Sequence, residues 1–132
     1  MDLKNFKRQH IEIYDIIKKI EEIIIKDDIS DYFDELASNI NKLSGKLQIH
    51  LNTEDKFLYP NLLKDDNVKH IAQKYVDEMG GILIQFISYK DKFNTKIKLK
   101  ENKNHIISET NSILLKITRR MNKEENELYK LI

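Results

Sequence analysis

The sequence contains no cysteine and very little glycine or proline. Of its 132 residues, none is cysteine, three are glycine and one is proline. Without cysteine there is no disulfide framework and no thiolate ligand, so zinc-finger and iron–sulfur sites are excluded, and any metal must be bound through nitrogen and oxygen. A β-rich protein needs more turn residues than this. The composition therefore favours long helices.

The sequence also lacks an excess of charge and a long apolar run. Its 23 lysines and arginines nearly cancel its 22 aspartates and glutamates, so no broad field of one sign is expected to attract nucleic acid or an acidic membrane. No apolar run approaches the roughly 20 residues of a membrane span, and residues 1–8 have no apolar signal core. We therefore expect a cytoplasmic protein that binds neither nucleic acid nor membranes, in a single domain over residues 1–132.

Apolar residues recur at intervals of three and four in four blocks, which is the periodicity of amphipathic helices. The blocks cover residues 4–26, 30–60, 68–93 and 105–132. We expect Ser30 to cap the second block and the lysine- and asparagine-rich segment 98–104 to be a solvated loop. Short links make consecutive helices antiparallel. The sequence thus predicts an all-α fold, an antiparallel up-down-up-down four-helix bundle.

Polar side chains take apolar positions in three of these blocks. His10 lies in the apolar stripe of the first block, His50 and Glu54 in that of the second, and Arg120 and Glu124 in that of the fourth. These positions are expected to meet at one height in the bundle. Residues four apart project from one helical face about 6 Å apart, so a His-x3-Glu pair can offer a nitrogen and an oxygen to one ion.

This polar cluster has two interpretations, because buried carboxylates must be paired with one another or with a cation. In the first, His10, His50, Glu54 and Glu124 bind one divalent ion and leave a coordination position open. In the second, Arg120 bridges the two glutamates in a dry, metal-free polar layer, for which a guanidinium is well suited.

The third block contributes Tyr75 and Met79 at the height of the cluster. We expect both residues to line the site. Tyr75 could donate a hydrogen bond into it or bind a ferric ion, but packing is the preferred interpretation for both Tyr75 and Met79. A haem held between His10 and Met79 is a weaker possibility. Gly80 and Gly81, which follow Met79, are expected to relieve crowding there.

The sequence resembles the hemerythrin-like, HHE cation-binding family, whose four-helix bundle holds non-haem iron between its helices. The segments that carry the resemblance, one in each block, are QHIEIYDII, HLNTEDKFLYPNLL, KYVDEMGGI and RRMNKEENELYKLI. By position, His10, His50, Glu54 and Glu124 match ligands of that family. The resemblance implies non-haem iron as the cofactor, mononuclear or dinuclear.

Three ligand positions of the family carry other residues here. Tyr75 and Met79 stand where the family has two histidines one turn apart, and the histidine of its last helix is replaced within Arg119-Arg120. These changes remove nitrogen ligands of a second iron and place a fixed positive charge near it. Full di-iron chemistry is therefore not expected.

The resemblance implies a non-enzymatic protein that binds or senses O2 or NO, or handles iron, at an open coordination position. A metal-free helical interaction module with a salt-bridged remnant of the site is the alternative. An enzyme of the oxidoreductase type is a third hypothesis, which the missing ligands disfavour. His70 and His105, at the starts of the third and fourth blocks, are expected to be solvated and outside the site.

Overall fold

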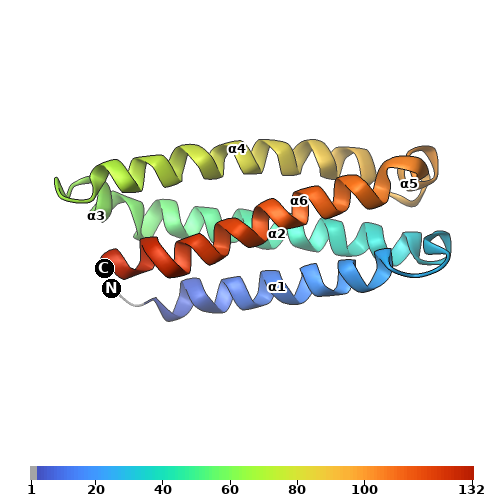
Figure 1. The fold of residues 1–132 in the computed structure, drawn as a ribbon, viewed down its shortest axis with the longest axis horizontal. Helices are drawn as coiled ribbons and strands as arrows, with labels where there is room; N and C mark the ends of the chain where they lie inside the picture. The colour runs from blue at the N-terminus through green and yellow to red at the C-terminus, as the bar shows by residue number, and fades with distance from the viewer. Residues whose placement is uncertain (1–2) are drawn as a thin grey trace.

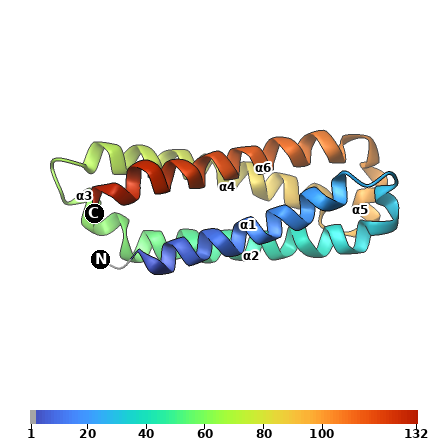
Figure 2. The ribbon, with the colours of Figure 1, turned by 60° about the horizontal axis from the view of Figure 1, so that its bottom comes forward.

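The computed structural model describes residues 3–132, and every regular element in that range is helical. The four long helices are α1 (Lys4–Ile24), α2 (Phe33–Phe57), α4 (Lys69–Phe93) and α6 (Ile106–Lys123). They run lengthwise beside one another, and the chain reverses direction from each to the next (Figures 1 and 2). The start of α1 and the end of the chain consequently lie at the same end of the molecule. The prediction of an all-α protein is confirmed.

Short helical elements add to the long ones, so the expected count of four helices was incomplete. They are η1 (Ile29–Tyr32), α3 (Tyr59–Leu63), α5 (Lys96–Glu101), η2 (Lys103–His105), η3 (Glu124–Leu128) and η4 (Tyr129–Leu131). The element η3 is a π-helical turn that continues α6 without a break. Within the described range, no helix is both long enough and apolar enough to cross a membrane.

The segment 98–104 is not the solvated loop that its composition predicted. Thr95 caps α5 by accepting a hydrogen bond from the backbone N–H of Lys98 at 3.2 Å, and Leu99 is fully buried in the main core. Burying one leucine side chain contributes about 2 kcal/mol. This buried leucine and the hydrogen bond from Asn102 Nδ2 to the carbonyl oxygen of Lys92 hold the segment against the end of the long helices.

The start of the second block also differs from the prediction. Asp28, rather than Ser30, is the cap, because its carboxylate accepts the backbone N–H of Ser30 at 3.0 Å and begins η1, after which α2 starts at Phe33. At the other end, α2 stops before Leu58, and Pro60 lies in the first turn of α3. Proline is tolerated there because the first turn of a helix has no intrahelical use for its missing N–H.

The apolar core is divided by a polar layer. The larger cluster contains Ile13, Leu47 and Ile117, and the smaller one, near the chain ends, contains Phe6 and Leu128. In sequence, each polar position predicted for the site lies between a residue of the larger cluster and one of the smaller. Apolar side chains therefore cover the polar layer from above and below along the bundle axis.

Gly80 and Gly81 do not relieve crowding, contrary to the prediction. Both are exposed within α4, and a Cβ added at either position would meet no heavy atom within 4 Å. Glycine in an exposed helix costs about 0.5–1 kcal/mol relative to alanine. We expect Gly80→Ala to raise the free energy of unfolding by that amount, measured by urea denaturation. A loss of stability would show that the position is crowded after all.

Candidate metal centre

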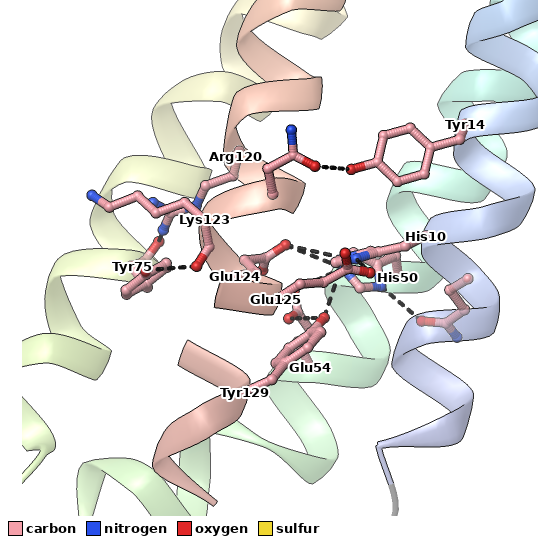
Figure 3. Close-up of polar contacts among 12 residues, drawn as sticks. His10, Tyr14, His50, Glu54, Tyr75, Arg120, Lys123, Glu124, Glu125 and Tyr129 are labelled. Carbon is pink, nitrogen blue, oxygen red and sulfur yellow. Dashed lines mark hydrogen bonds and ion pairs between the residues drawn. The ribbon is translucent and has the colours of Figure 1, made fainter. Parts of the chain in front are cut away.

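Four of the predicted site residues meet inside the bundle (Figure 3). His10 comes from α1, His50 and Glu54 from α2, and Glu124 from the first residue of η3, and all four are 0% exposed. The expectation that these positions face one another at a common height is therefore confirmed.

The distances between their polar atoms are short. His10 Nε2 lies 3.0 Å from His50 Nε2 and 3.2 Å from Glu124 Oε1. His50 Nε2 lies 3.2 Å from Glu54 Oε1 and 3.6 Å from Glu124 Oε1. Nitrogen and oxygen ligands that are each about 2.0–2.2 Å from one ion are separated from one another by roughly 3.0–3.5 Å. The ligand atoms of His10, His50 and Glu124 therefore lie close enough together to hold one metal ion, and Glu54 adjoins this group through His50.

The outer nitrogens of the two histidines are held by acceptors. His50 Nδ1 lies 2.8 Å from Gln9 Oε1, and the orientation of this amide is fixed because Gln9 Nε2 donates to Thr53 Oγ1 at 3.0 Å. His10 Nδ1 lies 3.0 Å from Glu125 Oε1. An amide or carboxylate oxygen can only accept, so both Nδ1 atoms carry the proton. When Nε2 carries no proton, as binding of an ion requires, each ring presents the lone pair of Nε2 to the centre of the cluster.

The two carboxylates leave acceptor capacity unused. Glu54 Oε1 and Glu124 Oε2 are among the buried side-chain atoms of the described residues that have no hydrogen-bond partner. An unsatisfied buried acceptor costs about 1–3 kcal/mol, and more when it is charged. Two lone-pair nitrogens and two incompletely paired carboxylates form a donor set that fits a cation of the iron or zinc type.

In the absence of a metal, protons compensate part of this excess of acceptors. Burial lowers the pKa of His50, but hydrogen bonds to Glu124 and Glu54 outweigh it and raise that pKa to about 9. Burial, together with the nearby charge of Glu124, raises the pKa of Glu54. Burial opposes ionisation of Glu124 as well, but its bonds to His10 and His50 hold its pKa below the usual range. The cluster therefore retains protons at neutral pH that a metal ion could displace.

Arg120 does not bridge Glu54 and Glu124, so the predicted salt-bridged layer is wrong. Its side chain is buried but leans toward α4, where Nη1 donates to Glu78 Oε2 and Nη2 to the carbonyl oxygen of Tyr75, each at 2.5 Å. No ion pair joins Arg120 to either buried glutamate within the described residues. Sequence periodicity places Arg120 on the inner face but does not say which neighbouring helix it meets.

Tyr75 does not donate into the cluster either. Its hydroxyl donates to the carbonyl oxygen of Lys123 at 3.2 Å, and its ring lies 4.0 Å beneath the guanidinium of Arg120. Tyr75 therefore packs beside the cluster, against Arg120 and its partner Glu78. This contact agrees with a packing role for Tyr75 rather than with a role as a ligand.

Met79 is buried and lines a cavity of about 220 Å³ between α2 and α4, together with Tyr59 and Gly80. This volume is below the roughly 300–1,000 Å³ of pockets for larger organic ligands. Both ring nitrogens of His10 are engaged by polar side chains. The geometry therefore gives no support to a haem between His10 and Met79.

As expected, His70 and His105 are exposed and lie outside the cluster.

Sequence periodicity missed two residues of the site, Gln9 and Tyr129. The hydroxyl of Tyr129 lies 3.2 Å from both His10 Nε2 and Glu54 Oε2, and the side chain is buried. In a regular α-helix the residue on the same face as Glu124 is Leu128, four positions later. The π-helical turn η3 adds a residue to this turn, with the N–H of Tyr129 bonded to the carbonyl of Glu124, and so brings the fifth position inward.

Comparisons with curated proteins and with solved structures give no significant match. One protein-family comparison does give a match, to the hemerythrin HHE cation binding domain, and it extends over residues 1–132. This family is described as cation-binding, in agreement with the donor set assembled by α1, α2 and η3. The chain belongs to the hemerythrin HHE cation-binding family.

Proposed function

We propose that this chain is a non-enzymatic, hemerythrin-like protein that binds non-haem iron through His10, His50, Glu54 and Glu124. In this proposal α1, α2, α4 and α6 act as the antiparallel four-helix bundle of the family, with the metal centre near the end where the chain begins and finishes. The role of the centre is to bind or sense a small molecule such as O2 or NO, or to handle iron.

One observation supports metal binding above the others. His10 Nε2 and His50 Nε2 face each other at 3.0 Å, while acceptors hold the opposite nitrogen of each ring. Two lone pairs at that distance repel each other unless a proton or another cation lies between them. A metal ion in this position would take the place of the proton that otherwise joins the two rings.

A single ion fits the surroundings better than two. Tyr75 and Met79 offer no imidazole from α4, and Arg120 places a fixed positive charge beside Tyr75 and Glu78. A second cation on that side would find no imidazole ligand, and the Arg120 guanidinium, already paired with Glu78, takes the place of a metal ligand there. We therefore infer a mononuclear centre.

Iron in this centre would supply an open coordination position for a diatomic molecule. The surrounding residues would keep the centre dry and its ligands oriented. The two apolar clusters exclude water from the polar layer, and the contacts of Gln9 and Glu125 hold the two imidazole rings in place. The metal-free interaction module loses its main support, because the Arg120 bridge on which it depended does not form.

Metal analysis of freshly purified protein tests the proposal directly. Protein from iron-supplemented cells is expected to contain about one iron per chain, with near-ultraviolet absorption from iron and no intense haem band. Chelation followed by addition of Fe²⁺ or Zn²⁺ under argon should restore one ion per chain. Protein that takes up neither ion would contradict the proposal.

Gln9 should affect the affinity without touching the ion. Its side-chain oxygen accepts from His50 Nδ1 at 2.8 Å, and loss of such a partner weakens metal binding by about ten- to a hundredfold. We expect Gln9→Leu to lower Zn²⁺ affinity by that factor in a competition titration. Gln73→Leu is a matched control, because Gln73 is exposed on α4 and bonds only to Asp77 in the described contacts. Equal affinity in wild type and Gln9→Leu would contradict the assigned role.

A further inference from the structure

We propose that Tyr129 is an additional ligand of the centre, and that its phenol oxygen makes the site selective for a trivalent ion, ferric iron in particular. This inference rests on the proposed function, because it requires that the polar cluster bind a metal. It goes beyond that function by naming a fifth donor and the charge state of the ion that the site retains.

The position of the Tyr129 hydroxyl is the first argument. It lies 3.2 Å from His10 Nε2 and 3.2 Å from Glu54 Oε2, which are separations found between ligands of one ion. His10 Nε2 is the same nitrogen that faces His50 and Glu124. The hydroxyl is thus among the inward-facing donor atoms rather than beside the outer nitrogens of the rings, as Figure 3 shows.

The Tyr129 ring is held in place by its neighbours. It stacks on the His10 ring with centroids 5.5 Å apart and an angle of 24° between the planes, and it packs against Phe6 at 5.8 Å. The π-helical turn before it fixes the backbone that carries it. Little side-chain freedom remains to be lost when the oxygen binds an ion, so the ligand is preorganised.

Charge balance is the second argument. Glu54 and Glu124 are 0% exposed and together offset a divalent ion, while the imidazoles add no charge. A trivalent ion would leave one uncompensated positive charge in a dry interior, which is costly. Arg120 does not change this balance, because Glu78 pairs with it, and Glu125 lies on the outer side of the His10 ring with its side chain 34% exposed. A phenolate from Tyr129 supplies the third negative charge.

The chemistry of this step is a ligand exchange without electron transfer. When a trivalent ion binds, the O–H bond of Tyr129 breaks, its proton leaves to solvent, and the bond from oxygen to the ion forms. With a divalent ion the phenol keeps its proton and remains a hydrogen-bond donor to Glu54. The two charge states of the ion are therefore distinguished by one proton on one residue.

Tyr129→Phe tests this inference, with Tyr75→Phe as the matched control. Tyr75 is also buried near the site, but its hydroxyl bonds to the Lys123 carbonyl. Wild type loaded with ferric citrate is expected to show a visible phenolate-to-iron absorption band, which Tyr75→Phe keeps and Tyr129→Phe loses. Tyr129→Phe should also release Fe³⁺ to a chelator about ten- to a hundredfold faster. Its Zn²⁺ affinity should stay within about fivefold of wild type, the value of one neutral hydrogen bond.

The outcomes separate this inference from the proposed function. Iron-loaded wild type without the band, or a Tyr129→Phe protein that keeps it, would overturn ligation by Tyr129 and leave metal binding intact. Wild type that binds neither Fe³⁺ nor Zn²⁺ would overturn both. Resonance Raman spectra of wild type, excited in the band, give a test that does not depend on the variant folding. Enhanced phenolate ring vibrations support the inference, and their absence overturns it.

Discussion

Replacing His50 by alanine is expected to weaken metal binding by about a hundred- to a thousandfold. Structural four-ligand zinc sites bind with roughly 10–16 kcal/mol, so one ligand accounts for about 2.5–4 kcal/mol. His50 Nε2 lies within 3.2 Å of His10 Nε2 and Glu54 Oε1, so the loss of its ring removes a central donor. Competition titration with a chromophoric Zn²⁺ chelator measures the change.

His105→Ala is the matched control for this prediction. His105 is exposed at the opposite end of α6 from Glu124, so its removal should leave the affinity unchanged. Circular dichroism and unfolding of the metal-free proteins establish that His50→Ala is folded under the conditions of the titration. Equal loss of affinity in both variants would show that the measured ion is bound elsewhere.

Metal affinity is expected to rise steeply with pH up to about 9. The pKa of His50 is raised to about 9 and that of Glu54 is also raised, so both groups hold a proton near neutral pH in the metal-free protein. A metal ion must displace both protons. Displacement of two protons makes the affinity increase about a hundredfold for each pH unit up to about pH 8, where Glu54 loses its proton, and about tenfold for each unit from there to about pH 9. Zn²⁺ titrations at a series of pH values measure this slope.

Glu54→Gln provides the control for the pH dependence, because it removes one of the two displaced protons and should halve the slope of log affinity against pH.

The raised pKa of His50 also predicts how the stability of the metal-free protein depends on pH. The folded state binds more protons than the unfolded chain between about pH 6.5 and 9, so stability must fall as pH rises through that range. A metal affinity that is independent of pH would contradict the prediction that His50 and Glu54 hold protons near neutral pH in the metal-free protein.

The four candidate ligands could be predicted from the sequence because they lie on regular helices. His10, His50, Glu54 and Glu124 all continue an apolar stripe by steps of three or four residues, and the structure brings all four together. Tyr129 was missed because the π-helical turn that precedes it breaks this step. Arg120 was placed on the correct face but given the wrong partners. Periodicity predicts the direction in which a side chain leaves its own helix. It does not predict which neighbouring helix a long side chain such as that of Arg120 will contact.

The sequence by itself determined the all-helical class, the inward positions of the four ligand candidates and the family resemblance, because each follows from the local repeat of apolar residues or from residues close in the chain. Only the tertiary structure decided which partners Arg120, Tyr75 and Leu99 take, and how the Gln9 and Glu125 side chains orient the two imidazoles. Those contacts join residues distant in sequence. They depend on how the helices are rotated and staggered against one another, which packing of the whole core determines.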